Sequence, residues 1–233
     1  MGSFSNLILP LLGAGLVGYL LGSISFAIIM TKLFIKDDVR NFGSGNAGAT
    51  NVLRAAGRRA SALTFVCDFI KCAASVLLGK QIIVWACTVN NLDPVSYARL
   101  GMYAAGILCI IGHMYPLYFG FRGGKGVVTT SAMMAMLDWR VFLVCAVVFF
   151  STFFWKKIVS LSSVSAALTY PVATFAITFF VDFKYLGGFP VSYVALATAV
   201  AALAGFVVTV KHRDNIKRLI KGEEKPISFK KQR

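Results

Sequence analysis

The stretch ASALTFVCDFIKCAASVLLGKQIIVWAC, residues 60–87, decides the class of fold. Its residues are mostly apolar, and only Asp68, Lys71 and Lys80 carry a charge. A hydrophobic helix of about 20 residues crosses a bilayer core of about 30 Å, so this stretch is long enough to span a membrane. Over the 233 residues, 58% are hydrophobic and 14% are charged, whereas soluble domains carry about 25% charged residues. The sequence therefore predicts an all-α integral membrane protein.

Six further apolar stretches predict a single bundle of about seven transmembrane helices, forming one domain over residues 1–233. The predicted membrane segments are residues 7–30, 60–87, 98–119, 127–137, 141–155, 161–181 and 191–210, and a basic tail follows at 211–233. The segments at 7–30, 60–87, 98–119, 161–181 and 191–210 are long enough to span. The segment at 127–137 reaches only about 16 Å at about 1.5 Å per residue. We expect a short helix there, with its N-terminus directed at the polar loop before it.

The formal net charge of +15 comes from 24 Lys and Arg against 9 Asp and Glu. Most of these cations lie between the predicted segments on one side of the bundle. By the positive-inside rule this side is cytoplasmic and the N-terminus is outside. The charge thus reflects membrane topology and attraction of anionic lipid or substrate, and it does not indicate a nucleic-acid partner.

Three polar runs interrupt the apolar sequence on the predicted cytoplasmic side. They are GSGNAGATNVLR at 43–54, GFRGGKG at 120–126 and KHRDNIKRL at 211–219. Each combines cations with short hydrogen-bonding side chains, and the first two are rich in glycine, a composition typical of anion sites. We expect them to act on a phosphorylated molecule at the membrane surface.

The first run matches GxGxxG formally, but a dinucleotide fold needs a preceding strand and a βαβ unit, and here a membrane helix precedes it. Asn46 is a candidate cap for a helix that runs to Ala56. On that helix Thr50 and Arg54 are four residues apart and share a face. An ordinary cytoplasmic loop is the alternative interpretation.

The second run resembles a phosphate loop but fails the Walker A pattern, because Gly126 stands where Ser or Thr would follow Lys125. Nucleotide hydrolysis is therefore not expected. Adjacent glycines let backbone N–H groups converge, and Arg122 and Lys125 neutralise negative charge. A glycine-rich hinge is the alternative.

His113 and His212 are the two histidines of the chain. His113 lies in an apolar helix, where a packing role is the commoner one. His212 and Asn215 are three residues apart and share a helical face in the third run. A juxtamembrane basic helix held to anionic lipid is the alternative for this run.

The remaining polar features have structural interpretations. Asp68 and Lys71, three residues apart in an apolar segment, predict an ion pair. The SLSS run at 160–163 either caps a helix or offers hydroxyl groups to a phosphate. The five cysteines lie in apolar segments without a CxxC pair, which predicts small core residues and neither disulfides nor a metal site.

Taken together, the three runs resemble the bacterial membrane acyl-phosphate:glycerol-3-phosphate acyltransferase family. Its patterns GSGNxGATNxxR, GHxxPxxxxFxGGKG and HRxNIxRLxxGxE match at residues 43–54, 112–126 and 212–224. Arg122, Tyr115 and Asp214 depart conservatively from these patterns. The resemblance covers nearly the whole chain, and the ordered triple is more specific than any one motif.

The resemblance implies a seven-helix fold with short or broken helices around a cytoplasmic-side active site, in the bacterial plasma (inner) membrane. It implies transfer of a fatty acyl group from acyl phosphate to the sn-1 hydroxyl of glycerol 3-phosphate. Lysophosphatidic acid and inorganic phosphate are the implied products, in the first acylation step of phospholipid synthesis. No cofactor or metal is expected. Expected partners are both substrates, membrane lipid and a soluble enzyme that makes acyl phosphate.

Site residues carry over by their motif positions, with Gly123, Gly124 and Gly126 cradling the acyl phosphate through backbone N–H groups. The candidate catalytic residues are His212, Lys125, Asn215 and Arg54. The candidate substrate-binding residues are Ser44, Asn46, Thr50, Asn51, Gly123, Gly124, Gly126, Arg122 and Ser163. The proton of the attacking hydroxyl goes either to His212 or to the phosphate of the donor.

The HxxxxD motif of acyl-CoA-dependent acyltransferases is absent, since Tyr118 and Lys217 stand five residues after the two histidines. This favours a donor other than acyl-CoA. The alternative from another class is a membrane transporter of a phosphorylated metabolite, which would line a polar path to the outer face. A structural anchor with a basic tail leaves the first two runs unexplained.

Overall fold

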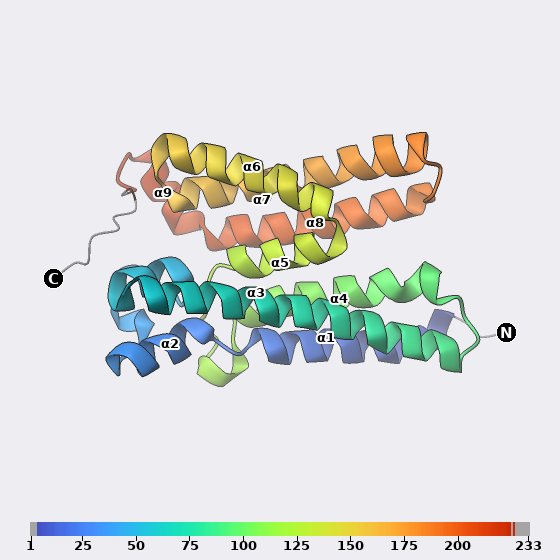
Figure 1. Ribbon diagram of the computed structural model, residues 1–233, viewed down its shortest axis with the longest axis horizontal. Helices are drawn as coiled ribbons and strands as arrows, with labels where there is room; N and C mark the ends of the chain where they lie inside the picture. Colours follow the sequence, from blue (N-terminus) through green and yellow to red (C-terminus); the bar gives the residue numbers. More distant parts are fainter. Residues whose placement is uncertain (1–3, 225, 227–233) are drawn as a thin grey trace. The chain divides into compact units, whose positions relative to one another are not determined.

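A computed structural model describes residues 4–224 and 226, and within this part of the chain all regular elements are helical (Figure 1). The chain divides into two compact units, of which the first ends at Leu137 and the second begins at Asp138. A single acyltransferase domain over residues 1–233 stays a prediction. Positions 225 and 227–233 of the predicted basic tail lie outside the described residues.

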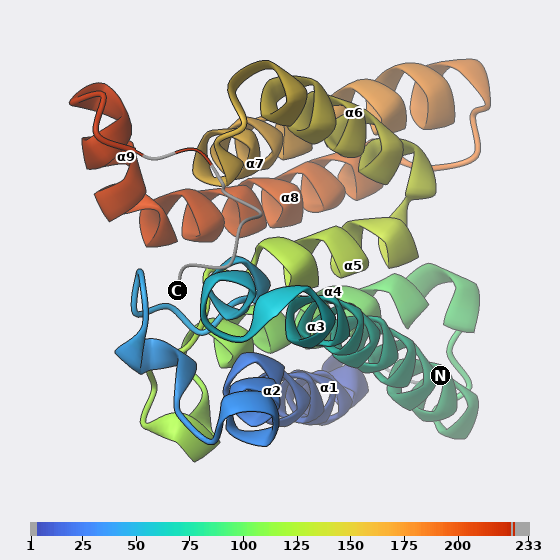
Figure 2. The ribbon, with the colours of Figure 1, turned by 60° about the vertical axis from the view of Figure 1, so that its left-hand side comes forward.

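The first unit is built around three long helices that run side by side (Figures 1 and 2). Its α-helices are α1 (Ile8–Gly22), α2 (Phe26–Ile35), α3 (Ala49–Val89), α4 (Pro94–Met114) and α5 (Val127–Leu137). Three 3₁₀ turns accompany them: η1 (Phe4–Leu7), η2 (Val39–Asn41) and η3 (Leu117–Phe119). The helices α1, α3 and α4 pack on one another, and α5 packs on α3 and α4.

The second unit is a smaller helical bundle. It contains α6 (Trp139–Lys156), α7 (Val159–Ala176), the π-helix η4 (Ile177–Tyr185), α8 (Val191–Lys211) and α9 (Arg213–Ile220). The helix α7 packs against both α6 and α8. Arg140 ties the start of α6 to η4, because its guanidinium lies 2.8 Å from a carboxylate oxygen of the buried Asp182.

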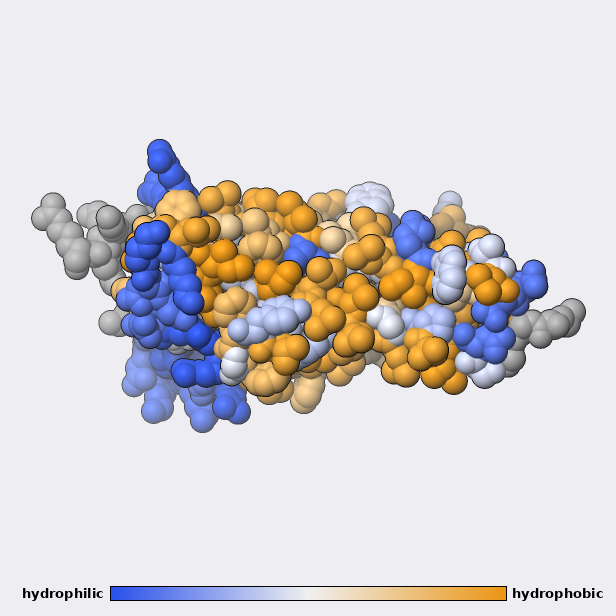
Figure 3. All heavy atoms as spheres, turned by 90° about the horizontal axis from the view of Figure 1, so that it is seen from below, coloured by the Kyte–Doolittle hydropathy of each residue, from blue (hydrophilic) through white to orange (hydrophobic). Residues whose placement is uncertain are grey.

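Among the described residues, six helical stretches are long and apolar enough to cross a membrane. They are Phe4–Ile35, Ala49–Val89, Pro94–Phe119, Trp139–Lys156, Val159–Tyr185 and Val191–Lys211. The short helix Val127–Leu137 follows the second polar run, as predicted. On the face drawn in Figure 3, hydrophobic side chains cover the middle and hydrophilic side chains gather at the two ends. The pattern is that of a multi-pass membrane protein.

The fourth long span extends beyond its predicted bounds. The sequence predicted a membrane segment at residues 141–155, and α6 has 18 residues. Asp138 caps this helix by accepting the N–H of Arg140 at 2.9 Å, and the helix therefore begins before the first aliphatic residue.

The first predicted segment, 7–30, is corrected, because it is two helices and not one. The chain leaves α1 after Gly22 and enters α2 through Ser25, whose φ and ψ of −90° and 92° are extended. The Ser23 hydroxyl donates to Tyr19 O at 2.8 Å. The carbonyl of Ile24, which no longer serves a continuous helix, accepts a hydrogen bond from Lys71 Nζ at 2.6 Å. The sequence is continuously apolar across this break, so nothing in its composition indicates that the helix ends here.

Backbone contact between α1 and α4 depends on glycine. A Cβ built on Gly18 would collide with the backbone of Ala105, and one built on Gly22 would collide with the backbone of Cys109. These two glycines are four residues apart and form the small-residue seam by which membrane helices approach closely. Gly112 repeats the arrangement from α4, against the carbonyl of Tyr19.

The five cysteines are free thiols. Four of them are buried, and Cys67 is partly exposed. They lie on α3, α4 and α6 as small packing residues.

We expect Gly22→Ala to lower the stability of the folded protein, because the new methyl group meets the backbone of α4. Overpacking of this kind costs about 1–3 kcal/mol. Gly13→Ala is the matched control, since nothing lies within 4 Å of its Cβ position on the same helix. Thermal unfolding of both variants in detergent measures the difference, and equal midpoints would contradict this account of the seam.

Candidate active site

A single amide shapes the first polar loop. Asn51 is buried, and its Nδ2 donates to the carbonyl oxygens of Val39, Phe42 and Asn46 at 2.9, 2.9 and 3.1 Å. Its Oδ1 accepts the backbone N–H of Ser44 at 3.2 Å. Both polar atoms of Asn51 are therefore used within the loop, whereas the Ser44 side chain is exposed. Asn51 holds the shape of the loop and presents Ser44.

Asn46 does not cap the following helix, which corrects one prediction. The helix α3 has Gly48 as its N-cap residue, without a side-chain hydrogen bond. The Asn46 Nδ2 instead donates back to Ser44 O at 3.0 Å. The amide therefore closes a turn two residues upstream of the helix.

The first helical stretch of α3 ends where the sequence predicted, after Ala56. Gly57 is non-helical, with φ 85° and ψ −175°, a conformation that glycine adopts without strain. Thr50 and Arg54 lie in this short stretch and are partly buried. Their spacing of four residues puts them on one face.

In the second polar loop, the backbone N–H groups of two glycines are already used. Gly123 N donates to Met114 O at 3.2 Å, and Gly124 N donates to His113 O at 3.1 Å. These carbonyl oxygens belong to the last turn of α4, where a helix has no donors of its own to offer. In this structure both N–H groups therefore donate to the end of α4, and a phosphate cradle at Gly123 and Gly124 stays a prediction.

What Gly123 and Gly124 provide is space. A Cβ on Gly124 would lie 2.6 Å from Ala47 O and would collide with Nε2 of His113. Ala47 N also approaches Gly123 O at 3.5 Å. The absence of side chains at these glycines therefore brings the first and second polar loops into contact within the first unit.

The groups that remain for binding an anion come after Gly124, at Lys125 and in the first turn of α5. The helix α5 opens with a hydrogen bond from Thr130 N to Gly126 O at 2.8 Å, so the first-turn N–H groups before Thr130 have no helical acceptor. Gly126 has a φ of 80°, which turns the chain sharply into the helix. Lys125, partly buried, stands directly before that turn. A helix N-terminus beside a lysine is a favourable phosphate site.

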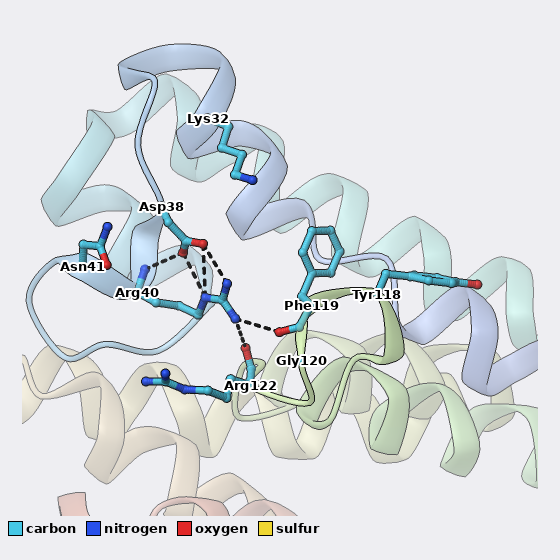
Figure 4. A pocket seen from close by; sticks show the side chains of 8 residues that line it. All are labelled: Lys32, Asp38, Arg40, Asn41, Tyr118, Phe119, Gly120 and Arg122. Carbon is cyan, nitrogen blue, oxygen red and sulfur yellow. Dashed lines mark hydrogen bonds and ion pairs between the residues drawn. The ribbon is translucent and has the colours of Figure 1, made fainter.

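Arg40, which the sequence did not single out, fastens the second loop to the first. Its Nη1 donates to Phe119 O at 2.7 Å and approaches Arg122 O at 3.4 Å (Figure 4). Hydrogen bonds from Arg40, acting against the effect of burial, hold the pKa of Asp38 below its usual value. The Arg122 side chain is exposed. In the sequence, only the spacing of two residues between Asp38 and Arg40 could have indicated this ion pair.

An open pocket of about 570 Å³ lies where Arg40 joins the second loop to the first. Its lining residues are Lys32, Asp38, Arg40, Asn41, Tyr118, Phe119, Gly120 and Arg122. In Figure 4 the guanidinium of Arg40 lies at the centre of the pocket, where it donates hydrogen bonds to Asp38 and to the loop carbonyls. The polar residues of this pocket therefore hold the second loop in place.

In the second unit, His212 lies at the junction of α8 and α9 and is buried. Its Nδ1 lies 2.8 Å from Val208 O. A carbonyl oxygen can only accept, so Nδ1 carries the proton and Nε2 has the lone pair in the neutral imidazole. Asn215 lies one turn further on and is also buried.

Glu224 holds Asn215 in place, a role that the sequence analysis missed. Its Oε1 accepts from Asn215 Nδ2 at 2.6 Å and from Ser160 Oγ at 2.7 Å, and its Oε2 accepts from Arg218 Nε at 2.5 Å. Burial raises the pKa of Glu224, but these three hydrogen bonds outweigh it and hold the pKa below its usual value. The stabilisation is present above the unfolded-state pKa and is lost as pH falls through the folded-state pKa. In the sequence, the position of Glu224 at the end of the third motif was the one indication of this role.

The serines of the SLSS run do not cap α7, whose N-cap residue is Ile158. Ser163 is buried, and its hydroxyl donates to Val159 O at 2.8 Å. A hydroxyl oxygen that donates in this way can still accept a hydrogen bond.

The predicted ion pair in α3 is confirmed, with Lys71 Nζ 2.7 Å from Asp68 Oδ1. His113 of α4 joins it, with Nδ1 3.2 Å from Lys71 Nζ. All three side chains are buried. Removing one member of a buried pair costs about 3–5 kcal/mol, because the other charge remains without compensation.

Comparison with known proteins gives one family. The glycerol-3-phosphate acyltransferase family model matches residues 12–222. The chain belongs to the glycerol-3-phosphate acyltransferase family.

Individual relatives agree with this assignment. A glycerol-3-phosphate acyltransferase of Neisseria meningitidis serogroup A is 36% identical over 92% of this chain and 96% of its own. One from Aquifex aeolicus is 36% identical over 88% and 93%. Two crystal structures of PlsY, an integral membrane glycerol 3-phosphate acyltransferase, match with TM-scores of 0.71 and 0.69. These are a glycerol 3-phosphate form and a lysophosphatidic acid form, 34% and 32% identical, each covering 94% of this chain and 96% of PlsY.

The protein is therefore a multi-pass membrane acyltransferase of phospholipid synthesis, and the transporter alternative is set aside. The resemblance of the three polar runs identified the family correctly.

We expect Glu224→Gln to lower kcat/KM by about tenfold, because the neutral amide no longer offers two strong acceptors to Asn215, Ser160 and Arg218. Glu223→Gln is the matched control, since the neighbouring Glu223 side chain is exposed. Steady-state kinetics of the two purified variants make the comparison. Equal rates would show that the Glu224 contacts do not position the third motif.

Proposed function

We propose that the enzyme transfers a fatty acyl group from acyl phosphate to the sn-1 hydroxyl of glycerol 3-phosphate. The products are lysophosphatidic acid and inorganic phosphate. The observation that carries this proposal is the anion site at the start of α5, beside the loop of Ser44, in a chain of this family. Both substrates carry a phosphate, and PlsY has been solved with glycerol 3-phosphate and with lysophosphatidic acid.

The donor phosphate is proposed to bind at the first turn of α5. The first-turn N–H groups and Lys125 hold its charge, and Gly126 supplies the turn that exposes them. Gly123 and Gly124 serve by letting the loops approach, and Arg122 adds positive charge at the rim.

The glycerol 3-phosphate is proposed to meet the polar residues of the first and third motifs. In the first motif, the proposed binding residues are Ser44, Thr50 and Arg54, on a loop whose shape Asn46 and Asn51 hold. The other proposed binding residues, carried over by their positions in the sequence, are His212, Asn215 and Ser163.

The reaction is a single acyl transfer. The sn-1 oxygen attacks the carbonyl carbon of the acyl phosphate, the bond from that carbon to the phosphate oxygen breaks, and phosphate leaves with the electron pair. The hydroxyl proton passes to the leaving phosphate, with His212 as a binding group. An acyl phosphate is a mixed anhydride, so positioning and charge stabilisation are sufficient without a covalent enzyme intermediate.

The proposed site faces the cytoplasm, with the N-terminus outside, in the inner membrane of a bacterium. The basic residues around the polar runs support this orientation through the positive-inside rule. A soluble enzyme that makes acyl phosphate is the proposed supplier of the donor, and membrane lipid surrounds the acyl chain.

We expect purified protein to release inorganic phosphate from palmitoyl phosphate only when glycerol 3-phosphate is present, and to use palmitoyl-CoA poorly. Lys125→Ala should lower kcat/KM by about a hundredfold, because the anion loses its nearest fixed cation. Lys80→Ala, at an exposed lysine of α3, is the control. Turnover with palmitoyl-CoA alone would refute the proposed donor.

We expect His212→Gln to retain measurable turnover, since the donor phosphate and not the imidazole takes the proton. The two variants His212→Gln and Lys125→Ala are compared in the same phosphate-release assay. If His212→Gln is as inactive as Lys125→Ala while it still binds both substrates, His212 is the base and the substrate-assisted route is wrong.

A further inference from the structure

Three buried polar side chains lie behind the second polar loop, and the proposed mechanism does not use them. Asp68 and Lys71 belong to α3, and His113 belongs to α4. Their exposed fractions are only 2%, 5% and 6%. Charges at such depth in a membrane protein are expensive and generally serve a function.

The ammonium group of Lys71 is the hub of this cluster. It lies 2.6 Å from Ile24 O, 2.7 Å from Asp68 Oδ1 and 3.2 Å from His113 Nδ1. The ammonium group thus makes hydrogen bonds with Ile24 O and His113 Nδ1 and an ion pair with Asp68. The hub thus ties together the break between α1 and α2, the middle of α3 and the end of α4.

This arrangement also fixes the orientation of the His113 ring. Nδ1 of His113 lies 3.2 Å from Lys71 Nζ and 3.6 Å from Asp68 Oδ1, so both charged groups face this nitrogen. A Cβ built on Gly124 would collide with this Nε2, so the nitrogen lies directly against the backbone of the loop. The loop therefore rests directly on the imidazole ring.

His113 contacts the loop through its backbone as well. Its carbonyl oxygen accepts the N–H of Gly124 at 3.1 Å, while the next carbonyl, of Met114, accepts the N–H of Gly123. The rotation of the imidazole and the position of the loop are thus set by the same residue. Lys71 and Asp68 reach the loop through His113.

We propose that Asp68, Lys71 and His113 form a positioning cluster that sets the loop of residues 123–126, and with it Lys125 and the first turn of α5, for the donor phosphate. This inference rests on the proposed function of that loop. The three residues touch neither substrate, so their effect is to be seen in the Michaelis constant of one substrate and in the mobility of the loop.

Two substitutions of His113 separate its contacts. His113→Asn keeps an acceptor near the position of Nδ1, for Lys71, but loses the contact with Gly124. His113→Gln keeps an amide that reaches Gly124. We expect His113→Asn to raise the KM for palmitoyl phosphate by about tenfold and His113→Gln to raise it less, with the KM for glycerol 3-phosphate nearly unchanged in both.

The control is Ser75→Ala, a buried serine of α3 that donates to Lys71 O and does not touch the loop. The double variant Asp68→Asn/Lys71→Met removes both charges together and so avoids leaving one buried charge without its partner. Hydrogen exchange, followed by mass spectrometry, reports the amides of Gly123 and Gly124 in each variant. We expect faster exchange there in the double variant, and unchanged exchange in α8.

The two readouts distinguish this inference from the proposed function. If the wild type does not use palmitoyl phosphate but loop exchange rises in the double variant, the donor is wrong and the positioning cluster stands. If the wild type uses palmitoyl phosphate and loop exchange and KM stay unchanged in folded variants, the cluster is refuted. Equal KM values for His113→Asn and His113→Gln would also overturn it, because the contact with Gly124 would then be irrelevant.

Discussion

The core of a bilayer contains no water, so each backbone polar group and each charge in a spanning segment must find its partner within the protein. The break between α1 and α2 leaves the Ile24 carbonyl without a helical donor, and Lys71 supplies one from α3. Lys71 in turn requires a counter-charge, which Asp68 provides one helical turn away. The helix break and the ion pair therefore depend on each other, and either alone would leave an uncompensated group in the membrane.

The same constraint governs the polar loops. The last carbonyl groups of α4 have no helical donors, and the N–H groups of Gly123 and Gly124 satisfy them. Glycine is required here because the loop backbone lies against His113 and Ala47. The cost of ending α4 inside a packed region is thus met by the loop itself. What is left for a ligand is the opposite end of the loop, at Lys125 and the start of α5.

The sequence could predict features that depend on composition or on local spacing, but not those that depend on contacts between distant residues. Long apolar stretches and a stretch too short to span are visible as composition, and so the helices and the short α5 were predicted. Asp68 and Lys71 were predicted as a pair because their spacing is local. The break at residues 23–25 was missed because its apolar character is continuous and the group that stabilises it, Lys71, is distant in sequence.

The site residues show the same limit. Glycines at 123 and 124 indicate a backbone that needs space, but they do not indicate that its N–H groups point to the end of α4. His113 resembled a packing residue because its partners come from another helix. Glu224 closes the third motif, yet only the structure shows that it accepts from Ser160, more than 60 residues away. Long-range polar pairing is what a single sequence does not reveal.

Each unit thus contains a charged group that is held by several polar partners. In the first unit a cation, Lys71, lies close to Ile24 O, Asp68 Oδ1 and His113 Nδ1, and in the second an anion, Glu224, accepts from three donors. In both cases one of the partners is a candidate site residue or touches one: His113 lies against the phosphate loop, and Asn215 belongs to the third motif. A charge held by several polar partners fixes the direction of the groups around it more sharply than apolar packing does. Polar groups oriented in this way before the substrate arrives need little reorganisation during the reaction, which is the main requirement of an acyl transfer from an already activated donor.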